Sequence, residues 1–126
     1  MTVFNLDLDQ TMLNRKKIVV IEHDEIWQNS ITHLINSTDK FIVAGCYANW
    51  IEASSNLLRI KPDVVLTEII GDARNGVSEI GMTKQKLPNA EILILTSQEE
   101  DSIVLGALRA GASGYILKSA NSYFLV

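Results

Sequence analysis

Five short apolar runs, separated by segments of helical periodicity, constrain the fold of this chain more than any other feature of its sequence. β-branched and aliphatic residues follow one another in these runs without polar alternation, which is typical of strands buried on both faces of a parallel sheet. Strands that alternate with helices predict an α/β fold, a doubly wound five-stranded parallel sheet with helices on both faces. The predicted strands are residues 17–21, 41–46, 63–69, 91–96 and 114–117.

The segments between the runs carry apolar residues at the spacing of helices that cover a sheet. We expect Asp24 to cap the first helix, whose inward face carries Trp27, Ile31, Leu34 and Ile35. Residues 119–126 resemble the start of a last helix that is cut short. Two further helices are predicted at residues 51–60 and 102–110. Another is predicted between a loop carrying Gly71 and Gly76 and the Pro88-Asn89 pair, with Val77, Ile80 and Leu87 on its inward face.

Length and composition indicate one ordinary domain. The 126 residues suffice to bury a full core, and the net charge of −4 gives no basic surface for nucleic acid or an anionic membrane. The polar residues 1–16 are expected to form a flexible N-terminal extension, followed by a single domain at 17–126. Since the chain shows no signal peptide or membrane-spanning run and has Cys46 as its sole cysteine, we expect a soluble, cytoplasmic protein.

Polar side chains follow the predicted strands at their carboxyl ends, where ligands of open α/β sheets bind. Carboxylates there can hold a hard cation such as Mg²⁺ through oxygen ligands. A lysine and a hydroxyl can neutralise and hydrogen-bond a phosphoryl group. The set therefore suits phosphoryl chemistry on a carboxylate. Its members are Glu22, His23 and Asp24 after the first strand, Glu68 on the third, Thr96 and Ser97 after the fourth, and Lys118 after the fifth.

Sequence motifs of common enzyme classes are missing from the chain. It contains neither a Gly-x-Ser-x-Gly elbow nor a Cys–His pair for nucleophilic hydrolysis. The segment 111–114, GASG, lacks the lysine of a phosphate-binding loop and precedes a strand rather than a helix. We therefore predict that the chain is not an enzyme.

Three segments carry a resemblance to a known family. Residues 61–68, KPDVVLTE, look like the third strand of response-regulator receiver domains, which usually ends in the phosphorylated aspartate. Residues 93–97, LILTS, resemble the fourth strand with its switch hydroxyl, and 107–118, ALRAGASGYILK, is very close to receivers of the NarL/FixJ subfamily. The resemblance implies a flavodoxin-like receiver fold in two-component signal transduction and phosphorelay.

The resemblance also implies roles for single residues. Glu68 falls on the phosphoacceptor position, while Thr96 and Lys118 keep the family's identities for switching and phosphate contact. Tyr115 falls near the face through which such domains usually signal. The family's acidic pair falls on Glu22 and His23, so Mg²⁺ is not required and would bind weakly, if at all, through Glu22 and Glu68.

Two departures from the family pattern weigh against phosphorylation. A glutamate is longer than an aspartate by about 1.5 Å, and a displacement near 1 Å can cost roughly a hundredfold in a positioned reaction. His23 removes a hard oxygen ligand from the acidic pair. The Glu68 carboxylate is expected to reach toward Lys118 and Thr96 and to imitate a phosphorylated aspartate in part. We therefore predict an atypical pseudo-receiver that is constitutive or controlled by a partner or ligand.

Simpler interpretations of the same residues stay open. Asp24 is favoured as an N-cap over a metal ligand, and His23 as a surface imidazole over a catalytic group. Thr96 can be a β-branched strand end without a switching role. A plain salt bridge would account for both Lys118 and Glu68 without any regulation.

The leading hypothesis is the receiver part of a transcriptional response regulator. Its expected partners are a sensor kinase or another signalling protein, DNA only through a C-terminal output domain outside this sequence, and a second copy in a homodimer. No membrane partner is expected. The alternatives are a phosphate-free protein–protein adaptor and a flavodoxin-like domain that binds a small ligand or metal.

Overall fold

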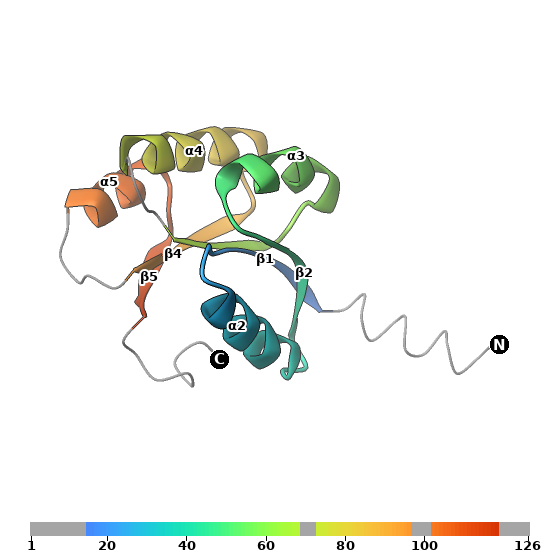
Figure 1. Ribbon diagram of the computed structural model, residues 1–126. Coiled ribbons are helices and arrows are strands. Elements are labelled where there is room, and N and C mark those ends of the chain that lie inside the picture. Colours follow the sequence, from blue (N-terminus) through green and yellow to red (C-terminus); the bar gives the residue numbers. More distant parts are fainter. Residues whose placement is uncertain (1–14, 69–72, 97–101, 119–126) are drawn as a thin grey trace.

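The computed structural model describes residues 15–68, 73–96 and 102–118. Five parallel strands form one sheet in the order β2-β1-β3-β4-β5. Helix α2 lies on one face of the sheet, and α3, α4 and α5 lie on the other (Figure 1). The predicted doubly wound fold is therefore confirmed. The elements are β1 (Lys16–Ile21), α2 (Glu25–Asn36), β2 (Phe41–Tyr47), α3 (Trp50–Ile60), β3 (Val64–Glu68), α4 (Ala73–Lys86), β4 (Glu91–Thr96), α5 (Ser102–Ala110) and β5 (Gly114–Leu117).

The predicted loop at Gly76 is wrong, because α4 already begins at Ala73 and includes that glycine. A helical glycine costs only about 1 kcal/mol relative to alanine, and the packing of the helix outweighs that cost. Ile80 anchors the helix, since its side chain is completely buried. Leu87 lies one residue beyond the helix but still packs against the core, as predicted.

Some sequence-based predictions lie outside the described residues. They concern most of the N-terminal extension, Gly71, Ser97 and the expected start of a last helix at 119–126. Within the described part of the chain, no helix is long and apolar enough to cross a membrane.

Two apolar clusters fill the space on the two faces of the sheet. Because strand side chains alternate between faces, Val19 and Ile21 of β1 belong to the cluster beneath α3, α4 and α5, while Ile18 and Val20 belong to the cluster beneath α2. Complete burial of such a side chain contributes roughly 1.5–3 kcal/mol. The two clusters hold the strands in register, and this fixes where the polar residues at the strand ends lie.

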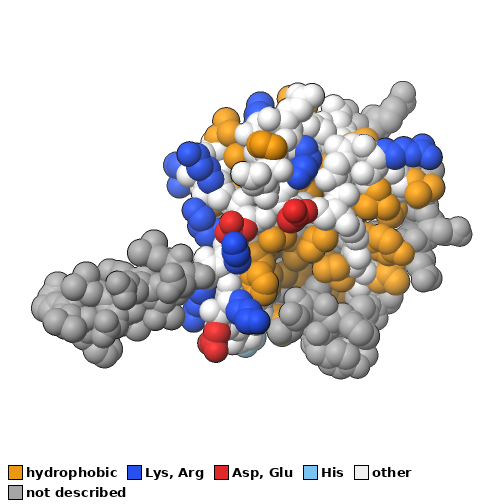
Figure 2. Space-filling view, turned by 180° about the vertical axis from the view of Figure 1, so that it is seen from behind, with side chains coloured by type: hydrophobic (Ala, Val, Ile, Leu, Met, Phe, Trp, Pro, Cys, Tyr) orange, Lys and Arg blue, Asp and Glu red, His pale blue; other side chains and the backbone are white. Residues whose placement is uncertain are grey.

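Part of the apolar surface stays exposed. Among the residues whose side chains the structure describes, the exposed large apolar ones are Ile26, Ile51, Leu58, Met82, Leu105 and Tyr115. On the face seen from behind, apolar side chains form a broad area with charged side chains to its left and above it (Figure 2). Exposed apolar area of this kind is a common feature of surfaces that contact other proteins.

Candidate functional site

The carboxyl ends of the strands bring the predicted polar residues to one edge of the sheet. Glu22 directly follows β1, and its backbone N–H donates to the Tyr47 carbonyl at the end of β2 over 2.9 Å. Glu68 is the last residue of β3. Lys118 follows β5, and its backbone N–H donates to the Thr96 carbonyl over 2.7 Å. Backbone pairing of parallel strands therefore positions these side chains next to one another.

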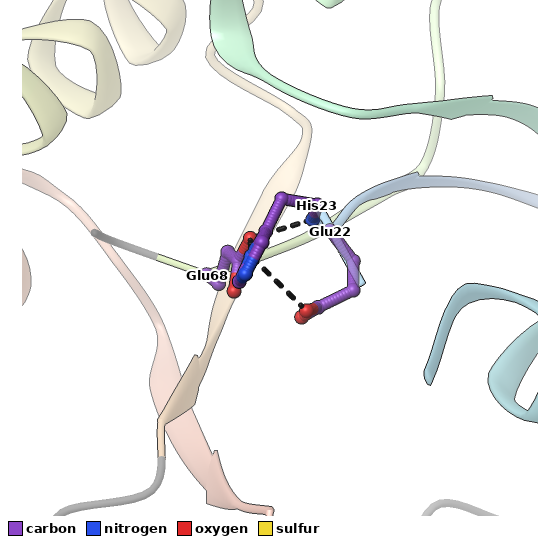
Figure 3. A group of neighbouring side chains, drawn as sticks. All are labelled: Glu22, His23 and Glu68. Atoms are coloured by element: carbon purple, nitrogen blue, oxygen red, sulfur yellow. Dashed lines mark hydrogen bonds and ion pairs between the residues drawn. The ribbon is translucent and has the colours of Figure 1, made fainter. Parts of the chain in front are cut away.

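Glu68 is almost completely buried, and both of its carboxylate oxygens are engaged. Its Oε1 accepts a 2.6 Å hydrogen bond from the backbone N–H of His23 and also contacts His23 Nδ1 (Figure 3). Its Oε2 accepts a 3.1 Å hydrogen bond from Lys118 Nζ. Burial alone would raise the pKa of Glu68, but the hydrogen bonds from His23 and Lys118 lower it below its ordinary value. Glu68 is thus held as an ionised carboxylate.

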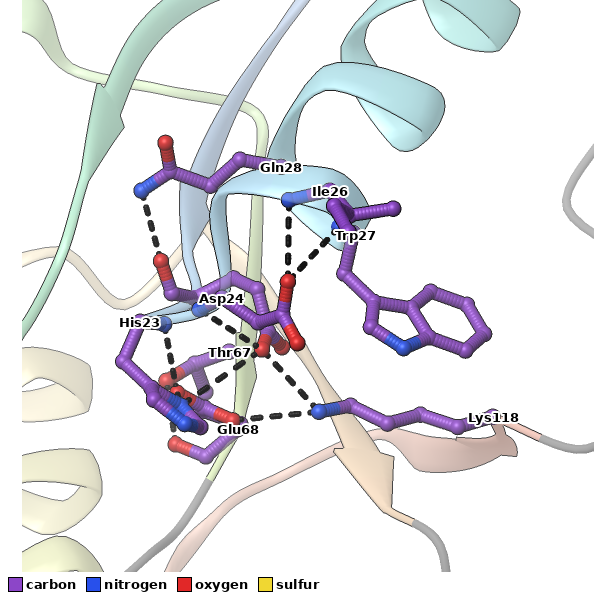
Figure 4. A network of polar contacts seen from close by, with 9 residues as sticks. His23, Asp24, Ile26, Trp27, Gln28, Thr67, Glu68 and Lys118 are labelled. Atoms are coloured by element: carbon purple, nitrogen blue, oxygen red, sulfur yellow. Dashed lines mark hydrogen bonds and ion pairs between the residues drawn. The ribbon is translucent and has the colours of Figure 1, made fainter.

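The ammonium group of Lys118 bridges the two glutamates of the site. Its Nζ lies 3.0 Å from Glu22 Oε1 and 3.1 Å from Glu68 Oε2. The same Nζ lies 5.6 Å from the centroid of the Trp27 ring, beside which the lysine chain runs (Figure 4). Burial acts to lower the pKa of Lys118, but the two carboxylates raise it above its ordinary value. The lysine therefore remains charged in this environment.

Glu22 is the more deeply buried carboxylate of the pair, with no exposed surface. Its Oε1 accepts from Lys118 and, over 3.3 Å, from the backbone N–H of Asp24. Its Oε2 has no hydrogen-bond partner among the described residues. Burial, together with the nearby charge of Glu68, raises the pKa of Glu22. Of the two glutamates, Glu22 is therefore the first to take up a proton.

His23 is exposed, as predicted, but it is more than a plain surface imidazole. Half of its side chain is accessible, yet its Nδ1 faces Glu68 and lies 3.6 Å from Glu22 Oε1. The hydrogen bond to Glu68 raises the pKa of His23 above its ordinary value of 6.5. Sequence reasoning missed this contact. The signal available was the extra length of Glu68, which lets its carboxylate reach the segment that follows β1.

This contact predicts a specific pH dependence of stability. A histidine whose pKa is higher in the folded than in the unfolded protein stabilises the fold fully below its unfolded pKa, and the contribution disappears as pH rises through the folded pKa. We expect the stability difference between the native protein and a His23→Asn variant to decline as pH rises above 6.5. Urea unfolding of both proteins at several pH values measures this stability difference. A constant or increasing difference would contradict the assignment.

Asp24 is the N-cap of α2, which confirms the favoured interpretation. Its Oδ1 accepts from the backbone N–H groups of Ile26 over 2.9 Å and Trp27 over 3.4 Å. Gln28, one turn further along, donates from Nε2 to the Glu22 carbonyl over 2.6 Å. No feature of the sequence pattern indicated this second contact. The Asp24 cap and the Gln28 hydrogen bond together hold the start of α2 against the segment that carries Glu22 and His23.

Thr96 and Tyr115 lie where the strand prediction places them, but their switching roles stay predictions. Thr96 ends β4 and is partly buried. Tyr115 lies on β5, at an edge of the sheet, with 42% of its surface exposed.

Three side chains come close enough to share a cation. Glu22, His23 and Glu68 each offer one ligand atom, and these atoms lie within 4.8 Å of one another. The set fits Mg²⁺ poorly, because Mg²⁺ favours octahedral oxygen ligands and one donor here is an imidazole nitrogen. In addition, both carboxylates already bind the ammonium of Lys118.

Comparison with known proteins identifies a family and several relatives. The family model described as "Response regulator receiver domain" matches residues 18–126. The transcriptional regulatory protein LnrK of Bacillus subtilis is 28% identical over 110 residues, covering 87% of this chain and 50% of that protein. The response regulator protein VraR of Staphylococcus aureus is 31% identical over 106 residues, covering 84% and 51%. The chain thus spans about half the length of these relatives.

Solved structures show the same fold. The signal receiver domain of the putative response regulator NarL from Mycobacterium tuberculosis superposes with a TM-score of 0.80 at 21% identity, covering 90% of this chain and 91% of that one. A two-component response regulator of the LuxR family from an Aurantimonas species gives a TM-score of 0.76 at 26% identity, covering 85% and 76%.

Proposed function

The chain belongs to the response regulator receiver family, and from this premise we propose that it is a signalling module that works without phosphorylation of Glu68. The observation that carries the proposal is the engagement of both Glu68 oxygens, one by His23 and the other by Lys118. An acceptor carboxylate must direct a free oxygen at the phosphoryl donor. In this protein that oxygen would first have to break a charge-assisted hydrogen bond.

The chemistry of the side chain supports the same conclusion. Glu68 is only 5% exposed. Its carboxylate also reaches about 1.5 Å further than that of an aspartate would. Since a reacting atom displaced by about 1 Å can cost roughly a hundredfold in rate, a longer, buried and doubly engaged carboxylate is a poor nucleophile for phosphoryl transfer.

The Glu68–Lys118 contact also supports an activity that is constitutive or controlled by a partner. The carboxylate occupies a position from which it pairs with the lysine, as a phosphorylated aspartate is expected to do. The imitation is partial, since a carboxylate carries one negative charge and a phosphoryl group about −1.5 to −2. We therefore propose that Glu68 imitates the phosphorylated state permanently and weakly, without being switched by phosphorylation.

The wider setting of the module follows from its relatives. Their printed names describe transcriptional and response regulators, and this chain covers about half of their length. We propose a non-enzymatic, cytoplasmic receiver that contacts a sensor kinase or another signalling protein, acts on DNA through a separate output domain, and pairs with a second copy of itself. The second candidate function is a phosphate-free adaptor, which the same engaged Glu68 also supports.

Intact-mass measurement tests the proposal. The native protein and a Glu68→Asp variant are incubated with Mg²⁺ and a small phosphoryl donor such as acetyl phosphate. We expect the native mass to stay unchanged. The shorter carboxylate of the variant withdraws from His23 and Lys118 and presents a free oxygen, so any added phosphoryl group is expected on the variant alone.

The possible outcomes separate the contributions of Glu68 and His23. A phosphoryl group on native Glu68, located by peptide mapping, would overturn the proposal. If neither protein is modified, a Glu68→Asp, His23→Asp double variant shows whether the altered acidic pair is the remaining obstacle. Modification of the double variant would leave the proposal standing.

A further inference from the structure

The candidate site contains two buried carboxylates that require compensating positive groups. Glu22 is completely buried and Glu68 is 5% exposed. An isolated buried carboxylate is strongly unfavourable, so buried charges are paired or bind metals. Glu22 and Glu68 must therefore be compensated by positive or hydrogen-bond-donating groups nearby.

Lys118 provides the first compensating group from within the fold. Its ammonium lies 3.0 Å from an oxygen of Glu22 and 3.1 Å from an oxygen of Glu68. Only 16% of its side chain is exposed, and the ring of Trp27 lies 5.6 Å from its Nζ. The ammonium is thus held between the carboxylates, where a shared cation would bind.

His23 provides the second group. Its backbone N–H and its Nδ1 both meet Glu68 Oε1, which leaves Oε2 to Lys118. A divalent cation would need the same oxygens. In addition, His23 supplies an imidazole at the position where the acidic pair of a receiver supplies a second carboxylate. The donors that meet Glu68 therefore compete with a metal instead of adding to its ligands.

We propose that Lys118 and His23 together take the place of a divalent cation, so that the candidate site is complete without Mg²⁺. The inference deepens the proposed function and rests on it for the identity of these residues as the receiver site. The ammonium of Lys118 and two N–H donors of His23 already bind the carboxylate oxygens that a metal ion would need. It also identifies His23 as the residue that determines cation selectivity.

Mg²⁺ titration without any phosphoryl donor tests this inference directly. The chain contains only two tryptophans, Trp27 and Trp50, so Trp50→Phe leaves Trp27, beside Lys118, as the sole indole emitter. In this background, MgCl₂ should cause no saturable change in emission beyond that of KCl at equal ionic strength. A second substitution, His23→Asp, removes the competing imidazole and adds an oxygen ligand. We expect it to bind Mg²⁺ at least about tenfold more tightly.

A second readout and a matched control keep the test independent of folding. Thermal unfolding with and without Mg²⁺ should show a rise in midpoint for His23→Asp alone, since binding to the folded state stabilises it. His33→Asp makes the same substitution on the exposed side of α2 and should respond like the native protein.

Two results would overturn the inference. One is saturable Mg²⁺ binding by the native protein. The other is a folded His23→Asp variant that gains no affinity. Neither result depends on phosphoryl transfer, so the proposed function and this inference can fail separately.

Discussion

Replacing Lys118 with methionine is expected to lower the free energy of unfolding by about 3 kcal/mol near neutral pH. The substitution keeps most of the side-chain volume but leaves Glu22 and Glu68 facing each other without the ammonium that bridges them. Removing one partner of a buried ion pair costs roughly 3–5 kcal/mol. We expect the lower end of that range, because 16% of the lysine side chain is exposed.

The loss of stability caused by Lys118→Met should depend on pH, and the raised pKa of Glu22 sets the direction of that dependence. Burial raises the pKa of Glu22, so this residue is expected to take up a proton first and to relieve the repulsion in the variant. The stability difference between native and variant proteins should therefore shrink as the solution becomes more acidic.

Urea unfolding at neutral and acid pH measures both effects. Lys86→Met, at an exposed position of α4, is the matched control and should stay within about 0.5 kcal/mol of the native protein. If Lys118→Met cost as little as this control, the bridging ammonium would have no structural role.

Replacing Ile80 with alanine should destabilise the fold by about 2–5 kcal/mol. The Ile80 side chain is completely buried in the cluster beneath α3, α4 and α5. The loss combines the transfer free energy of the deleted carbons with the cavity that a packed core cannot close. This residue also anchors α4, the helix whose start the sequence did not predict.

Ile51→Ala is the matched control for this second prediction. The same substitution is made at Ile51, a helical isoleucine that is 85% exposed. It should change the free energy of unfolding by less than about 0.5 kcal/mol. Equal losses at the two positions would contradict the assignment of Ile80 to the core.

Most of the fold was predictable because apolar patterning directly reflects burial. The runs at 17–21 and 91–96 read as buried strands, and the structure has Lys16–Ile21 and Glu91–Thr96. The beginning of α4 was not predictable, since Gly76 reads as a loop residue when local propensity is considered alone. Tertiary packing overrode that preference, through contacts that involve residues distant in the sequence.

The sequence predicted which strand-end residues gather at the candidate site, but not all of the contacts that they make there. Parallel strands place their carboxyl ends together, so Glu22, Glu68 and Lys118 were expected at one edge. Local capping rules were sufficient for Asp24. The contact between His23 and Glu68 depends on side-chain conformations and on one extra methylene, and the indole of Trp27 beside Lys118 depends on how α2 packs. Neither is encoded in local spacing.

The bridge made by Lys118 also bears on how the chain assembles. The lysine lies 96 residues from Glu22 and 50 residues from Glu68 along the sequence. Contacts between such distant residues form only after the chain between them has been ordered, because closing a long loop has an entropic cost. The candidate site is therefore expected to be among the last parts of the molecule to form, and its ion pairs slow unfolding more than they speed folding.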